Sequence, residues 1–89
     1  MPRYIQLEEA AKRLGSSPEQ LRQFEELGWI TTVEKAGVSY LADHQEYRAN
    51  FILALKRRRK LESDQIAMVL DRQRPPFNMN DVDRILSRA

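Results

Sequence analysis

The sequence contains no cysteine, a single histidine and only three glycines among its 89 residues. Without cysteine the chain has neither disulfide bridges nor thiolate ligands for a metal, and the one imidazole, His44, cannot form a ligand cluster alone. Neither a glycine-rich phosphate-binding loop nor a Ser-His-Asp arrangement can be assembled from this sequence. We therefore expect no catalytic residues, no metal site and no cofactor, and the composition argues against an enzyme.

Long apolar runs are also missing. No segment approaches the roughly 18 apolar residues of a membrane-spanning helix, and the first residues, MPRYIQLEEAAKRLG, are charged where a signal peptide has an apolar core. We expect a cytoplasmic protein that does not contact a membrane. A chain of 89 residues has room for one domain with a modest core.

The net charge of +2 is small, but its distribution is uneven. Residues 1–47 carry five basic and eight acidic side chains, a balance of −3. Residues 48–60 carry six basic side chains and no acidic one, and residues 61–89 carry four basic and five acidic. The positive charge is therefore local, and a local cluster of this kind binds phosphate backbones or acidic partners.

Two short helices are predicted near the start. Leu7, Ala10, Ala11 and Leu14 are spaced as one helical stripe, and Gly15 stands where a helix ends in the left-handed conformation. A second helix then begins, because Ser17 is a good N-cap, Pro18 fits the first helical position, and Gln20 completes a capping box. Its buried stripe is Leu21, Phe24 and Leu27, its polar face holds Glu19, Gln20, Gln23 and Glu26, and Gly28 closes it.

The remaining chain predicts a hairpin and three more helices. β-branched and aromatic residues flank a Lys35-Ala36-Gly37 turn, which indicates a small hairpin. Asp43 caps a third helix, Ser63 a fourth that ends before the prolines of RPP, and a fifth follows from Asn78. The expected fold is mainly α, a winged helix-turn-helix with about five short helices and a small β-hairpin wing. In the third helix we expect burial of Tyr47, Phe51, Ala54 and Leu55, with Ile52 at the margin and Arg58 toward the core edge. In the fourth we expect burial of Ile66, Val69 and Leu70. In the fifth we expect burial of Val82, which packs on Phe77, and of Ile85 and Leu86.

The stretch SSPEQLRQFEELGWI resembles the MerR-type signature, in which a Ser-Pro start is followed by Leu-Arg, an aromatic-Glu pair and a Gly before an apolar strand. The residues on these places are Leu21, Arg22, Phe24, Glu25, Gly28 and Ile30. The similarity continues through Gly37 of the wing and through Ile52, Ile66 and Leu70, and covers about residues 4–70. The resemblance implies a MerR-like winged helix-turn-helix over residues 1–74, with a short helix in 75–89 packed on the same domain.

In function, the resemblance implies a small DNA-binding protein, a transcriptional regulator or an accessory DNA-binding factor. Its second helix would lie in the major groove of double-stranded DNA while the wing contacts the backbone. Carried over residue by residue, the groove-facing set is Ser17, Gln20, Arg22 and Gln23. The positive cluster supplies the expected phosphate contacts, Arg48, Lys56, Arg57 and Arg59.

An alternative function rests on two departures from the family pattern. The family wing usually reads Gly-Tyr-Arg, whereas this chain has Gly37, Val38 and Ser39, and the second helix carries three glutamates with Arg22 as its one basic residue. Arg22 could equally pair with those glutamates in solvent, and the basic run could be a solvated helix end. Short relatives without a dimerisation coiled coil include excisionase-like DNA binders and chaperone modulators. The chaperone modulators have an acidic second helix and bind a J-domain co-chaperone. The alternative is therefore a protein-interaction module with a protein partner on the acidic second helix.

Overall fold

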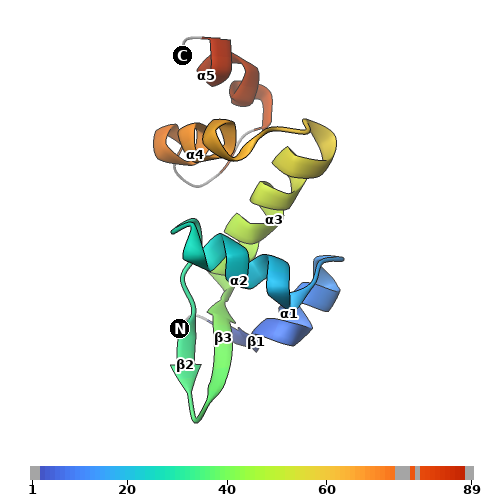
Figure 1. Cartoon of the computed structure of the whole chain (residues 1–89), viewed down its shortest axis with the longest axis vertical. Helices are drawn as coiled ribbons and strands as arrows, with labels where there is room; N and C mark the ends of the chain where they lie inside the picture. Colours follow the sequence, from blue (N-terminus) through green and yellow to red (C-terminus); the bar gives the residue numbers. More distant parts are fainter. Residues whose placement is uncertain (1–2, 74–76, 78, 88–89) are drawn as a thin grey trace. The chain divides into compact units, whose positions relative to one another are not determined.

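The computed structural model describes residues 3–73, 77 and 79–87, and the chain divides into two compact units, residues 1–50 and 51–89. The boundary falls inside one helix, α3 (Asp43–Arg58), so each unit includes part of that helix (Figure 1). Among the described residues there are five α-helices, one short 3-10 helix and a three-stranded antiparallel sheet. The mainly α fold with a β-hairpin wing is thus confirmed.

The first unit contains β1 (Tyr4–Gln6), α1 (Leu7–Arg13), α2 (Pro18–Glu26), β2 (Val33–Lys35), β3 (Val38–Ala42) and the start of α3. The strand order is β1-β3-β2, with Tyr4 opposite Ala42 and Val33 opposite Tyr40. The hairpin of β2 and β3 is the predicted wing (Figure 1). The sequence did not predict β1, because three residues before a helix are too short to show the alternation of a strand.

Both helices of the helix-turn-helix end at a glycine, as predicted. Gly15 has a φ of 66° and Gly28 a φ of 78°, which is the left-handed region that glycine adopts without steric cost. Past these glycines the chain donates back to each helix, from Ser16 N–H to the Ala11 carbonyl at 2.8 Å and from Trp29 N–H to the Phe24 carbonyl at 2.9 Å. These are the bonds of a Schellman motif, so each helix has a fixed end point.

Phe24 and Trp29 anchor α2 to the core of the first unit. They are 1% and 7% exposed, and their ring centroids lie 5.7 Å apart. Leu21 on the same face of α2 is fully buried, as predicted, whereas Leu27 is 48% exposed. Leu27 was predicted to be buried and that prediction is wrong, because it is the C-cap residue, where the chain leaves the helix.

The wing closes with a two-residue turn, Ala36-Gly37, between the paired residues Lys35 and Val38. Both turn residues have positive φ, 53° at Ala36 and 78° at Gly37. Positive φ at both positions matches the right-handed twist of the strands that a two-residue hairpin loop connects. Gly37 adopts this conformation readily, but Ala36 does so at a steric cost.

The burial predicted for α3 is partly wrong. Phe51 and Leu55 are buried as predicted, but Tyr47 is 45% exposed and Ile52, which we placed at the margin, is fully buried. The helix is covered on more than one side between residues 51 and 55, so a single apolar stripe underestimates its buried surface. Arg58, predicted to lie toward the core edge, is exposed.

The second unit holds the rest of α3, then α4 (Ser63–Arg72), the 3-10 helix η1 (Met79–Asp81) and α5 (Val82–Ser87). Its buried side chains include Ile66, Val69 and Leu70 of α4, as predicted, and Val82 of α5. The N-cap of α4 is Glu62 and not Ser63, because Glu62 and Gln65 form the reciprocal capping box, in which Glu62 N–H donates to Gln65 Oε1 at 3.0 Å.

The last helix differs in detail from the prediction. Asn78, the predicted start, lies outside the described residues, and Ile85 and Leu86 are half-buried where we predicted burial. Phe77, predicted to contact Val82, stacks on Phe51 with the ring centroids 4.6 Å apart and the planes 8° from parallel. Among residues 3–73, 77 and 79–87, no helix has the length and apolar character to cross a bilayer.

Candidate nucleic-acid interface

The residues that the resemblance assigned to the DNA groove lie in α2 and at its N-cap. Arg22 and Gln23 are exposed, and Ser17 and Gln20 are half-buried at the start of the helix. Ser17 Oγ accepts a hydrogen bond from Gln20 N–H at 3.2 Å, which confirms Ser17 as the N-cap. Gln20 Oε1 accepts from Ser16 Oγ at 3.1 Å, so the side chain of Gln20 is oriented at the helix start. Arg22 and Gln23 are therefore accessible on α2, whereas Ser17 and Gln20 form hydrogen bonds at the start of the helix.

Arg22 lies next to the tip of the wing. A hollow of about 250 Å³ is lined by Arg22, by residues of the wing tip and by residues around the start of α1: Gly37, Val38 and Ser39, with Gln6, Leu7 and Glu8. No ion pair joins Arg22 to Glu19 or Glu26, all three of which the structure describes. Arg22 and the wing tip thus line the same hollow.

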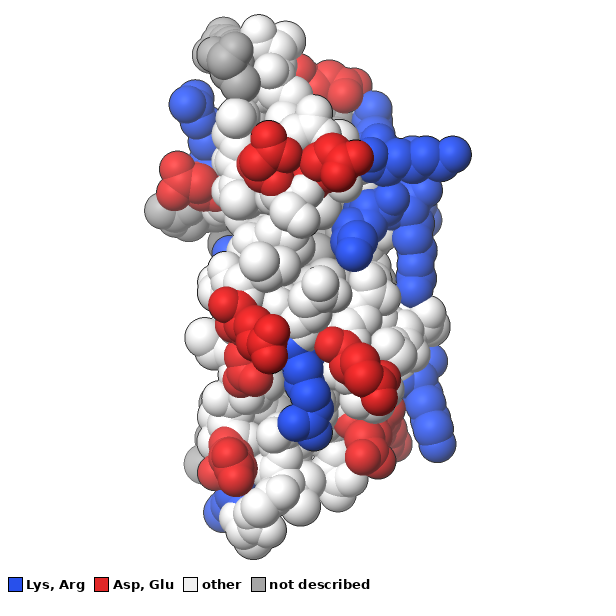
Figure 2. Space-filling model, in the orientation of Figure 1, with Lys and Arg blue, Asp and Glu red and all other residues white. Residues whose placement is uncertain are grey.

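The acidic residues of α2 are arranged in two ways. Glu25 accepts a hydrogen bond from Thr32 Oγ1, which ties the end of α2 to the segment that leads into the wing. Glu19 and Glu26 are exposed and carry no ion pair with any described residue. Figure 2 shows acidic side chains spread over the part of this face formed by α1 and α2. These carboxylates lower the positive potential around Arg22.

The wing has a cation that the sequence reading did not include in the site. Lys35, the last residue of β2, is exposed directly before the turn. It lines a second hollow of about 620 Å³, with Tyr4, Val33, Glu34 and Tyr40. The sequence could have indicated this cation, because a lysine stands two residues before Gly37. In the family pattern the cation of the wing follows the glycine.

Arg48 is half-buried and serves the helix-to-wing junction. Its Nε donates a hydrogen bond to the carbonyl oxygen of Trp29, just after α2. The neighbouring Gln45 accepts from Thr31 N–H through Oε1 at 2.9 Å. Two side chains of α3 thus satisfy backbone groups of the segment between α2 and β2, which holds that segment in place.

The other predicted phosphate contacts belong to the second unit. We call Lys56, Arg57, Arg58, Arg59 and Lys60 the basic cluster; Lys56 is half-buried and the other four are exposed. Arg59 forms an ion pair with Asp83 of α5, with Nη1 2.9 Å from one carboxylate oxygen and 3.2 Å from the other. In Figure 2, Lys and Arg side chains gather at the C-terminal end of α3.

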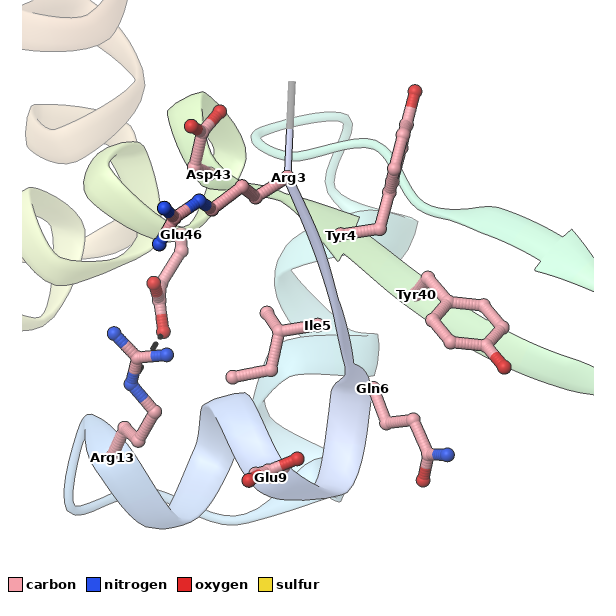
Figure 3. Close-up of a pocket in the computed structure, with 9 residues that line it drawn as sticks. All are labelled: Arg3, Tyr4, Ile5, Gln6, Glu9, Arg13, Tyr40, Asp43 and Glu46. Carbon is pink, nitrogen blue, oxygen red and sulfur yellow. Dashed lines mark ion pairs between the residues drawn. The ribbon is translucent and has the colours of Figure 1, made fainter. Parts of the chain in front are cut away.

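A further hollow of the first unit, about 670 Å³, lies between β1, α1 and the first turn of α3 (Figure 3). Arg13 Nε is 3.4 Å from Glu46 Oε2, an ion pair drawn as a dashed line. Tyr4 and Tyr40 extend away from that pair. Of the residues predicted for the site, none lines this hollow.

Helix, tight turn, helix and a two-stranded hairpin define this chain as a winged helix-turn-helix protein. A scan against protein-family models matches residues 5–73 to the family described as MerR HTH family regulatory protein. The match spans 69 of 89 residues, and the chain belongs to this family of DNA-binding regulators, which are typically not enzymes. Neither the search of curated proteins nor the search of solved structures found a match.

Proposed function

We propose that this protein binds double-stranded DNA with α2 in the major groove and the wing against the adjacent backbone. The observation that carries the proposal is the hollow shared by Arg22 and the wing tip at Gly37, Val38 and Ser39. A helix in the major groove brings its exposed side chains to base edges, and an adjoining wing then reaches the sugar-phosphate chain. A continuous surface of helix and wing therefore suits a duplex.

Within this surface, three side chains would read bases. Arg22 has a guanidinium that fits the O6 and N7 acceptors of guanine. Gln23 is exposed and Gln20 presents its amide NH₂ as a donor, since its Oε1 already accepts from Ser16. Ser17 stands at the helix start, where backbone N–H groups attract a phosphate.

Phosphate contacts would come from Lys35 of the wing and from Arg48 in the first unit, and separately from Lys56, Arg57 and Arg59 in the second. Residues 1–50 carry six basic and eight acidic side chains, a balance of −2, whereas residues 51–89 carry nine and five, a balance of +4. Counterion release supplies most of the non-specific affinity of a DNA-binding protein. The basic cluster would therefore provide most of the affinity, and α2 most of the sequence preference.

The proposal is tested by selecting duplexes from a randomised pool and measuring their affinity against salt concentration. Arg22→Gln should cost about 1–3 kcal/mol on the selected duplex and relax the preference at one base pair. Lys12→Gln is the matched control, because Lys12 is also an exposed cation on a neighbouring helix and lies outside the hollow. A pool that yields no preferred sequence, or equal losses from both variants, would refute the role of α2.

One other function, that of a protein-interaction module, is favoured by exposed side chains at α2 and its C-cap: Glu19, Glu26 and Leu27. An acidic helix with an exposed leucine suits a basic, partly apolar partner. In that case the protein would ignore duplex DNA even at about 50 mM salt, and Glu26→Lys would abolish capture of a protein from lysate treated with nuclease. Binding of duplex by the Glu26→Lys variant that exceeds binding by the unchanged protein would instead support the DNA surface.

A further inference from the structure

An aspartate of α5 forms an ion pair with one cation of the basic cluster. In the sequence its five cations are consecutive, and no acidic residue lies between Glu46 and Glu62. In the structure Asp83 of α5 supplies a carboxylate from 24 residues further along the chain, and both of its oxygens are within hydrogen-bond distance of Arg59 Nη1. A phosphate group offers oxygens to a guanidinium in the same way.

Asp83 pairs with Arg59 and not with Arg84, the arginine next to it in the sequence. Arg84 of α5 pairs with Asp81 at 3.0 Å, one turn earlier, so its guanidinium is occupied. The side chain of Asp83 is 71% exposed and that of Arg59 is 35% exposed, so the pair is at the surface and open to a competing anion. Phe77, which lies between α4 and α5 in the sequence, stacks on Phe51 of α3 and so fixes this segment to the helix that carries the cluster.

We propose that Asp83 competes with DNA phosphate for Arg59, so that α5 limits the affinity of the basic cluster for nucleic acid. The inference rests on the proposed function, since it concerns the phosphate contacts of that DNA-binding surface. Exposed ion pairs are worth up to about 1 kcal/mol, which corresponds to about a fivefold change in an equilibrium constant. The pair is thus weak enough for a polyanion to displace and strong enough for its loss to be measured.

The test compares Asp83→Asn with Asp64→Asn in the full chain. Asp64 is exposed in the first turn of α4, forms no ion pair with a described residue, and its substitution changes the net charge of the same unit by the same amount. Binding of a duplex of about 20 base pairs is measured from low to physiological salt, with inorganic polyphosphate as a second probe. Both variants are also made in an Arg59→Gln background, and circular dichroism verifies that all are folded.

We expect Asp83→Asn to tighten duplex binding about threefold to fivefold more than Asp64→Asn does, and to steepen the salt dependence by up to about one unit of slope. The advantage should vanish in the Arg59→Gln background. Equal effects of the two variants, or an advantage that persists without Arg59, would overturn the competition while leaving DNA binding intact. If polyphosphate shows the expected difference but no variant binds duplex, the competition for phosphate stands and the proposed DNA function fails.

Discussion

The turn at the tip of the wing can be tested with two substitutions that should change the stability of the first unit in opposite directions. Ala36 and Gly37 occupy adjacent positions with φ of 53° and 78°, and a Cβ added at Gly37 would meet no atom within 4 Å. Ala36→Gly removes one methyl group from the left-handed region, and Gly37→Ala adds one there. The methyl group added at Gly37 meets no packed atoms and Ala36 is exposed, so backbone conformation determines whether each substitution stabilises or destabilises the turn.

The magnitude follows from two opposing terms. The left-handed conformation costs a residue with a Cβ roughly 1–2 kcal/mol. A glycine gives the unfolded chain extra freedom, which offsets about 0.4–1 kcal/mol of that cost. We expect Ala36→Gly to stabilise the first unit by about 0.5–1 kcal/mol and Gly37→Ala to destabilise it by a similar amount.

Urea unfolding followed by tryptophan fluorescence is the measurement. Trp29 is the one tryptophan of the chain, is 7% exposed and belongs to the first unit, so its emission reports the unfolding of that unit. The midpoint should rise for Ala36→Gly, fall for Gly37→Ala and return near its original value for the double exchange. A lower midpoint for Ala36→Gly, or no change for Gly37→Ala, would mean that this turn is not held with both residues at positive φ.

Substitutions at two further positions test the site through stability. Ser17→Ala removes the acceptor of Gln20 N–H and should destabilise the first unit by about 1 kcal/mol in the same urea titration, whereas Ser17→Asp should retain the cap. Lys60 also has positive φ, 53°, just after α3, so Lys60→Gly should stabilise the second unit by about 0.5–1 kcal/mol in thermal unfolding followed by circular dichroism. The same variant should lose duplex affinity, because one cation of the basic cluster is gone; a variant that gains both stability and affinity would contradict the assignment of Lys60 to that cluster.

The parts of the fold that could be predicted are those fixed by local chemistry. Gly15 and Gly28 end the first two helices because left-handed residues favour glycine, and Ser17 caps α2 because its hydroxyl satisfies a free N–H group. The stripe of Leu21 and Phe24 follows from helical periodicity. Each of these signals lies within a few residues of its effect, so one sequence is sufficient to read it.

Tertiary contacts account for what the sequence could not predict. Strand β1 exists because residues 4–6 pair with residues 40–42, which lie far along the chain. In the sequence, Arg48 is one of the six basic residues of 48–60, and nothing distinguishes it from the others. Its hydrogen bond to the Trp29 carbonyl depends on how α3 packs beside the end of α2. The pairing of Arg59 with Asp83 joins residues 24 positions apart and leaves no trace in the local pattern.

The hydrogen bond of Arg48 also changes what a substitution there can test. Replacing Arg48 removes a cation, but it also leaves the Trp29 carbonyl without this donor at the junction where α2 is fixed to the wing. A lost phosphate contact lowers duplex affinity and reduces the salt slope by about 0.9, whereas a shifted helix weakens base recognition at every salt concentration. Loss of affinity in an Arg48 variant is therefore informative only through its salt dependence. Lys35, whose side chain forms no ion pair with a described residue, gives the cleaner measure of phosphate contact in the first unit.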